Sequence, residues 1–397
     1  MGFASGSMSF RRFAVVGQQP KQIDQDLLDK LTEFALQLGE YSVPDEVEYG
    51  WCGGRHVLDA KFSFEHNVFN DALHFALRID TNRVPGDLKK AYQMMEEEAV
   101  AAQNPSGHIS KNQRRDVKDV VRRKIEEELK SGRFRRSKLV PVLWDLPSHT
   151  LFTPASNQAA EKLLELFERT FGLELEPLGA GSLALRYCEK HGRRRDYEDA
   201  RPTRFVAGPE GKSQTPDYPW VAKGPEPKDF LGNEFLLWLW HETETGSGTL
   251  KIEGGGEISL VLDRALDLEC AYGQTGKDSL RADGCTRMPE ALDALRSGKL
   301  PRKVGMIIET AGHQFQTTLS AETLGLSGTT VPEVEDAEDA RVVFEERVAM
   351  LRDLARGLDG LFHAFLKLRI SSSWESQVGA IRKWISRSGK QAAVAVA

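Results

Sequence analysis

Apolar residues recur along most of the chain at the spacing of helices or of strands, and the two patterns alternate. Alternating or continuous apolar runs predict strands over residues 10–16, 59–64, 71–79, 138–144, 150–153, 236–240, 249–252, 258–262, 303–309 and 313–319. Apolar residues three and four positions apart predict helices over residues 23–38, 87–103, 110–131, 158–171, 289–295, 337–368 and 374–384. The expected fold class is α+β, with β-hairpins and packed helices.

The order of these elements predicts two related α/β regions, because a β-hairpin leads into a helix in both halves of the chain. Residues 1–85 and 134–180 form the first region, and residues 86–133 interrupt it as a helical hairpin. Residues 181–232, rich in Pro, Gly and charge, predict a long surface connection with at most short elements. The second region covers 233–330, and C-terminal helices follow over 331–397.

The second helix of the hairpin has unusually few apolar residues. Ser110 and Gln113 have the spacing of a capping box, and Gly132 stands where a helix commonly ends. Between these ends the apolar residues are only Val117, Val120, Val121, Ile125 and Leu129. So thin a stripe cannot bury a full helix face in a core. We therefore expect the hairpin to project from the body of the protein.

Composition is that of an ordinary soluble protein: of 397 residues, 40% are hydrophobic and 28% are charged. No run of eighteen apolar residues predicts a membrane span, so we expect a cytoplasmic protein without a membrane partner. The four cysteines are scattered, whereas a zinc site needs ligands that converge on one ion. We expect reduced, structural thiols and neither a metal nor another cofactor.

The net charge of −6 hides a strongly basic segment. Residues 111–138 hold twelve Lys and Arg against five Asp and Glu, a local charge of +7. Lys111, Arg115, Lys118 and Arg122 follow one face of the predicted helix. A polyanion would relieve the repulsion among these cations. The residues predicted to bind DNA are Lys111, Arg114, Arg115, Lys118, Arg122, Arg123, Lys124, Arg133, Arg135 and Arg136.

Contacts of this kind favour binding of double-stranded DNA without sequence preference, because Lys and Arg on phosphates carry no base information. The chain shows no zinc-finger spacing, no basic region leading into heptads and no aromatic RNA-binding strand. The competing interpretation is a solvated helix face balanced by the acidic residues 96–98 of the partner helix. The run 193–195, three arginines in the long connection, is a weaker candidate for nucleic-acid contact.

The succession of elements resembles the RdgC family of recombination-associated DNA-binding proteins. The resemblance covers most of the chain and rests on element order with scattered residues. Its segments are GFASGSMSFRRF (2–13), SKNQRRDVKDVVRRKIEEEL (110–129), KLVPVLWD (138–145), AAEKLLELFERTFGLELEPL (159–178) and LRADGCTRMPEALDALRSGKLPRKVGMIIETAGHQFQTTL (280–319). The connection over 179–232 looks longer than is usual for that family, and the chain extends beyond Arg369.

The resemblance implies a homodimer that closes into a ring around duplex DNA, with a positively charged lining. It also implies a nucleoid-associated protein that competes with RecA for DNA and so restrains homologous recombination. It implies no enzymatic activity.

Three enzyme motifs are only partly present. Residues 211–213 read Gly-Lys-Ser, but Val206 replaces the glycine that a P-loop needs. His241 and Glu242 lack the second zinc-binding histidine, because Thr245 occupies its position. Asp217, Glu226 and Lys228 loosely fit a Mg²⁺-dependent PD-(D/E)xK nuclease, although they lie in a proline-rich stretch. This nuclease is the alternative from another class, and a third is a protein-interaction scaffold that binds no DNA.

Overall fold

The computed structural model describes residues 2–37, 47–105, 107–206, 215–221, 227–252, 256–334 and 339–386. The described strands are β1 (Met8–Val16), β2 (Val47–Cys52), β3 (Val68–Phe69), β4 (Ala72–Asn82), β5 (Arg135–Asp145), β6 (Thr150–Thr153), β7 (Glu174–Leu178), β8 (Thr249–Lys251), β9 (Glu257–Cys270), β10 (Lys277–Leu280), β11 (Lys299–Thr310), β12 (His313–Ser320) and β13 (Leu326–Thr330). The helices are α1 (Gln25–Glu33), α2 (Phe64–Asn67), α3 (Gly86–Gln103), α4 (Lys111–Lys130), α5 (Asn157–Phe171), α6 (Ala180–Lys190), α7 (Arg194–Asp199), α8 (Phe230–Thr245), α9 (Pro289–Arg296), α10 (Ala340–Arg369) and α11 (Trp374–Ser386). This mixture of helices and antiparallel strands confirms the α+β class.

All the strands belong to one sheet, whose main path is β10-β9-β11-β12-β13-β1-β6-β5-β4-β2. Strand β1 joins its two halves. Met8 and Phe10 pair with β13, whereas the residues from Arg11 onward pair with β6 on one side and β7 on the other. The halves, β1–β7 and β8–β13, come from the ranges in which two α/β regions were predicted, and their boundaries as separate domains stay a prediction.

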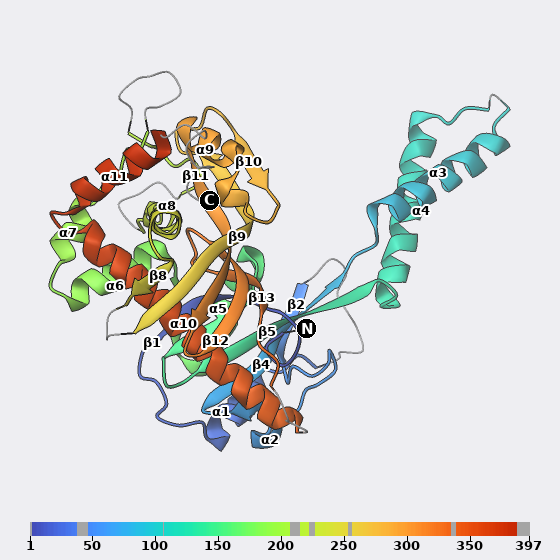
Figure 1. Ribbon diagram of the computed structural model, residues 1–397. Helices are drawn as coiled ribbons and strands as arrows, with labels where there is room; N and C mark the ends of the chain where they lie inside the picture. The colour runs from blue at the N-terminus through green and yellow to red at the C-terminus, as the bar shows by residue number, and fades with distance from the viewer. Residues whose placement is uncertain are drawn as a thin grey trace.

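The long helix α10 packs against both halves of the sheet (Figure 1). Its apolar side is buried in the larger of the two hydrophobic cores, together with α8. Its arginines and acids reach the N-terminal segment as well. Arg347 donates to the carbonyls of Phe3 and Gly6, and Asp359 accepts two hydrogen bonds from the buried guanidinium of Arg12 on β1, at 2.7 and 2.9 Å. These contacts fix β1 to the helix that crosses both halves.

One predicted strand is a helix. Residues 236–240 lie inside α8, whose residues from Phe230 to His241 are all buried. A helix enclosed on every side has no polar face, so its apolar run lacks the helical period and resembles a buried strand.

A second predicted strand, over 59–64, is irregular chain that follows a turn and reaches the first residue of α2. The carboxylate of Asp59 folds back to accept hydrogen bonds from the main chain and the side chain of Arg55, which closes the chain locally. Polar groups that satisfy neighbouring backbone groups in this way favour turns over strands.

The predicted connection over 181–232 contains substantial structure. It holds nearly all of α6, then α7 and the beginning of α8. Helix α6 buries Leu183, Ala184, Tyr187 and Cys188 in the core. The prediction of a mere surface connection was wrong. It followed the charged and proline-rich composition of the segment and overlooked the apolar face of α6. Strands β2, β3, β7, β10 and β13 were also not predicted.

His74 on β4 provides a test of the core. Its ring is enclosed by Phe3, Phe69 and Phe344, and burial lowers its pKa from 6.5 to about 4. The folded protein therefore holds a neutral ring, while the unfolded chain takes up a proton below pH 6.5. This contribution to stability is present above about pH 6.5 and is lost as the pH falls toward about 4.

We expect the free energy of unfolding of the wild type to fall by about 3 kcal/mol more between pH 7 and pH 4 than that of His74→Phe. Urea unfolding at a series of pH values measures the difference. If the free energy of unfolding changes equally with pH in the wild type and in His74→Phe, the histidine is not buried in its neutral form.

Candidate nucleic-acid interface

Helices α3 and α4 project from the body as an extension of two paired strands (Figure 1). Strand β4 leads into α3, and α4 returns the chain to β5, whose residue Arg135 pairs with Asn82 at the end of β4. The buried amide of Asn82 donates to the carbonyl of Leu129 at 2.7 Å, and Leu129 itself is buried. The base of the hairpin is thereby anchored to the sheet.

Helices α3 and α4 bury few residues, as the thin apolar stripe of α4 predicts. No described residue of α3 is buried, and α4 buries only Val117, Val121 and Leu129. The hydroxyl of Tyr92 donates to Glu128 at 2.5 Å, which raises the pKa of Tyr92. The ammonium of Lys124 lies 4.5 Å from the centre of the Tyr92 ring. Near the far end, the side chains of Asn104 and Gln113 exchange two hydrogen bonds.

The predicted capping box is confirmed. Ser110 accepts a hydrogen bond from the main chain of Gln113, and the side chain of Gln113 accepts one from the main chain of Ser110. Helix α4 begins and ends within one residue of its predicted bounds.

Most of the predicted cations lie on the surface of the hairpin. Lys111, Arg114, Arg115, Lys118, Arg122, Arg123, Arg133 and Arg136 are exposed, and Lys124 is half-buried. Only Arg122 among the cations of α4 forms an ion pair with a described residue, to Asp119 at 3.1 Å and Glu126 at 3.9 Å. Its side chain is still 68% exposed. Cations on this face therefore remain open to an external anion.

The acidic residues 96–98 of α3 do not balance this charge through direct pairing. None of them forms an ion pair with a described cation of α4, and Glu97 instead accepts from Gln93 on its own helix. The competing interpretation, a solvated face balanced by these acids, therefore has no direct ion pairs between the described residues to support it.

Two further cations line the same hairpin and were not predicted. Lys89 and Lys90, near the start of α3, face a groove of about 540 Å³ together with Lys118 and Arg122 of α4. Val121, Ile125 and Leu129 form part of the floor. Because the two helices of a hairpin run in opposite directions, the start of the first lies beside the end of the second. The antiparallel arrangement of the two helices could therefore have identified Lys89 and Lys90 from the sequence.

Arg135 has a structural role. Its guanidinium pairs with Asp80 and Glu48 at 2.9 Å each, and its side chain is only 16% exposed. Asp80 pairs in turn with the buried Arg78, and these cations hold the pKa of the Asp80 carboxyl below its usual value despite the opposing effect of burial. We therefore leave Arg135 out of the interface, and Arg136 beside it stays exposed.

The three arginines at 193–195 lie at the start of α7 and form ion pairs. Arg193 pairs with Asp196, Arg194 with Glu189 and Glu198, and Arg195 with Asp199. Acidic neighbours on α6 and α7 thus balance them, which weakens this run as a nucleic-acid contact.

The nuclease motif is not assembled among its described members. Lys228 is buried, and its ammonium donates to the carbonyls of Tyr197, Glu198 and Ala200 at 2.6–3.0 Å. A lysine held this way stabilises the chain around α7 and does not face a substrate water. Glu226 and residues 211–213 lie outside the described residues. In the described ranges no group of His, Cys, Asp and Glu is placed to hold a metal ion.

A scan against protein-family models and a search of curated proteins gave no match to this chain. The resemblance to the RdgC family therefore stays a hypothesis. No helix in the described ranges is long and apolar enough to cross a membrane.

Loss of the cap should loosen the basic helix at its far end. We expect Ser110→Ala to destabilise the first turn of α4 by about 1 kcal/mol, which speeds amide exchange there about fivefold. Hydrogen exchange over residues 111–115 measures this, with residues of β4 as the internal control. Unchanged exchange would show that the first turn does not depend on the cap.

Proposed function

We propose that the protein binds double-stranded DNA without reading its sequence, through the basic face of the α3–α4 hairpin, and that it is not an enzyme. The observation that carries the proposal is the row Lys111, Arg115, Lys118 and Arg122. These side chains are exposed and share one face of a helix that projects from the body. Three of them have no ion pair among the described residues.

The dimensions of this row suit a phosphate backbone. From Lys111 to Arg122 the helix rises about 17 Å, and a duplex carries about ten phosphates along that length of axis. The cations displace condensed counterions, and the released ions supply the free energy of binding. Lys89 and Lys90 extend the positive surface onto α3. Contacts to phosphates position a duplex and leave base edges unread.

By its resemblance to the RdgC family, the proposal extends to a homodimer that surrounds the duplex and restricts the access of RecA. This part rests on the element order and scattered residues that the chain shares with that family. A nuclease is the weaker candidate, since Lys228 is bound to three carbonyls. Incubation of a labelled duplex with the protein and Mg²⁺, followed by a denaturing gel, separates binding of intact DNA from cleavage.

The hairpin cations should determine the salt dependence of binding. Each phosphate contact contributes about 0.9 to the slope of log K against log salt concentration, so Arg115→Gln/Lys118→Gln/Arg122→Gln should flatten the slope by up to about 2.7. Fluorescence anisotropy of a labelled random-sequence duplex across a salt series measures it.

The matched control replaces three cations elsewhere on the surface, Arg195→Gln/Lys251→Gln/Lys277→Gln, whose side chains are 92%, 86% and 69% exposed. Both triple variants change the net charge equally. Equal slopes of log K against log salt concentration for the two variants would contradict the assignment of DNA binding to the hairpin. If the wild type does not bind DNA even at low salt, the scaffold interpretation remains.

The dimeric extension has its own test. We expect two chains per bound duplex by light scattering, and slower RecA-promoted strand exchange when the protein is added before RecA. The triple hairpin variant should lose this inhibition. Saturation with one chain per duplex, or inhibition retained by the variant, would contradict the ring.

A further inference from the structure

Strand β10 forms one end of the main path through the sheet and pairs only with β9 among the described strands. The main chain of Cys270 donates to the carbonyl of Gly276 at 3.0 Å, at the turn between the two strands. Residues of an antiparallel pair alternate between bonded and non-bonded positions. From that turn, Lys277 and Ser279 therefore direct their main-chain N–H and C=O groups away from β9. A free strand edge of this kind can pair with another chain.

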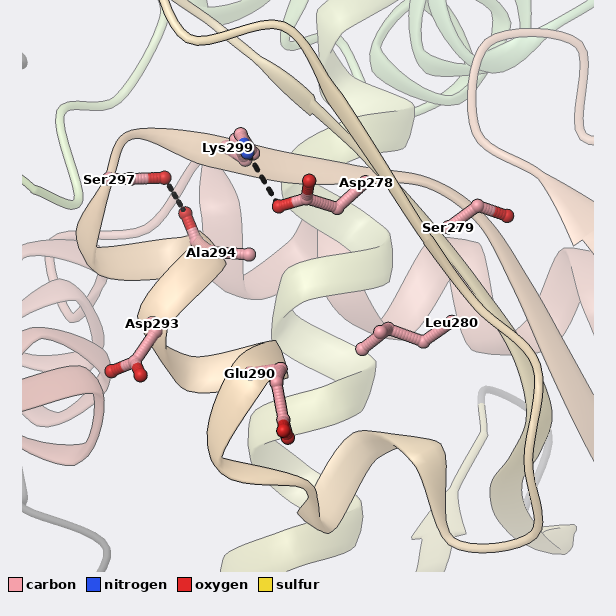
Figure 2. A pocket seen from close by; sticks show the side chains of 8 residues that line it. All are labelled: Asp278, Ser279, Leu280, Glu290, Asp293, Ala294, Ser297 and Lys299. Carbon is pink, nitrogen blue, oxygen red and sulfur yellow. Dashed lines mark hydrogen bonds and ion pairs between the residues drawn. The ribbon is translucent and has the colours of Figure 1, made fainter.

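Helix α9 packs against β11 and leaves a groove of about 480 Å³ between itself and β10 (Figure 2). Glu290, Asp293, Ala294 and Ser297 line it from positions on one side of the helix and its end. Asp278 and Leu280 line it from the strand, and both are half-buried, whereas Ser279 between them is exposed. A strand edge flanked by a helix is an arrangement that accepts an extended peptide as an added strand, with side-chain pockets along it.

The charge of the groove specifies its occupant. Asp278, Glu290 and Asp293 contribute three carboxylates, against the single ammonium of Lys299. Lys299 is mostly buried and already bound to Asp278 at 2.5 Å, as Figure 2 shows. Asp293 pairs with Arg296 at 2.6 Å but keeps 69% of its side chain exposed. Glu290 is exposed and forms no ion pair with a described residue. The groove therefore keeps an excess of one carboxylate, that of Glu290, with Leu280 and Ala294 as its apolar elements.

We propose that this groove, lined by Asp278, Leu280, Glu290, Asp293 and Ala294, binds an extended basic segment of a partner protein by strand addition to β10. Cationic side chains of the segment face the carboxylates of α9, and the alternate side chains are small and apolar. The groove shares no residue with the hairpin, so, on the proposed function, one molecule holds DNA and a protein partner together.

The test uses the full chain and a labelled probe peptide, acetyl-KVKVKVK, with acetyl-EVEVEVE as its charge-reversed match. Fluorescence anisotropy should show binding of the lysine peptide only. Ser279→Pro removes the outward N–H of the edge, where proline is tolerated. It should weaken binding about tenfold, the equivalent of one main-chain hydrogen bond. Ser279→Ala keeps that N–H and should bind as the wild type does.

A second variant, Glu290→Gln/Asp293→Asn, should weaken binding roughly threefold to tenfold, since exposed ion pairs are individually weak. Its match, Glu176→Gln/Glu198→Gln, removes two exposed carboxylates elsewhere and should leave binding unchanged. Equal binding of both peptides, absence of binding, or full affinity in Ser279→Pro would overturn the proposal. So would a change in oligomeric state caused by Ser279→Pro with peptide binding unaffected, because the edge would then join two copies of this chain.

Discussion

The bidentate ion pair between Arg12 and Asp359 lies where the two halves of the sheet meet. Arg12 belongs to β1, the strand that pairs with both halves, and Asp359 belongs to α10, the helix that packs across them. A buried charge that loses its partner costs several kcal/mol, so the pair fixes the register between strand and helix. Arg352 adds a second link from α10, to the buried Asp145 at the end of β5. The hairpin is inserted between the paired strands β4 and β5, so the strand that Arg352 links to α10 also holds the base of the hairpin.

The body and the hairpin differ in how their cations are paired. Several arginines of the body are held in ion pairs, as Arg78, Arg135 and Arg302 show. On the hairpin, Lys111, Arg115 and Lys118 have no such partners among the described residues. A helix that carries unpaired like charges is destabilised, and a bound polyanion removes that penalty. The proposed function follows from this contrast and does not depend on the net charge of the chain.

Sequence patterns predicted the hairpin best, because caps and charge are local. The capping box of Ser110 and the ends of α4 needed no knowledge of tertiary contacts. Helix α8 was not predicted as a helix because it is buried on all sides, so Phe235 to Trp240 show no polar face. Contacts between residues far apart in the sequence also determined which cations belong to the candidate interface. Arg135 looks like its neighbour Arg136 in the sequence, and only the approach of Asp80 and Glu48 makes it structural. Lys89 and Lys90 belong to the candidate interface because the packing of α3 on α4 places them beside cations of α4.

The central claim is that the hairpin is the surface that contacts DNA, and lysine footprinting tests it most directly. The protein is acetylated with and without a saturating random-sequence duplex, and the modified lysines are quantified by mass spectrometry. The account predicts protection of Lys111 and Lys118, with Lys251 and Lys277 on the body modified equally in both samples. Protection confined to the body, with the hairpin lysines still fully modified, would contradict it.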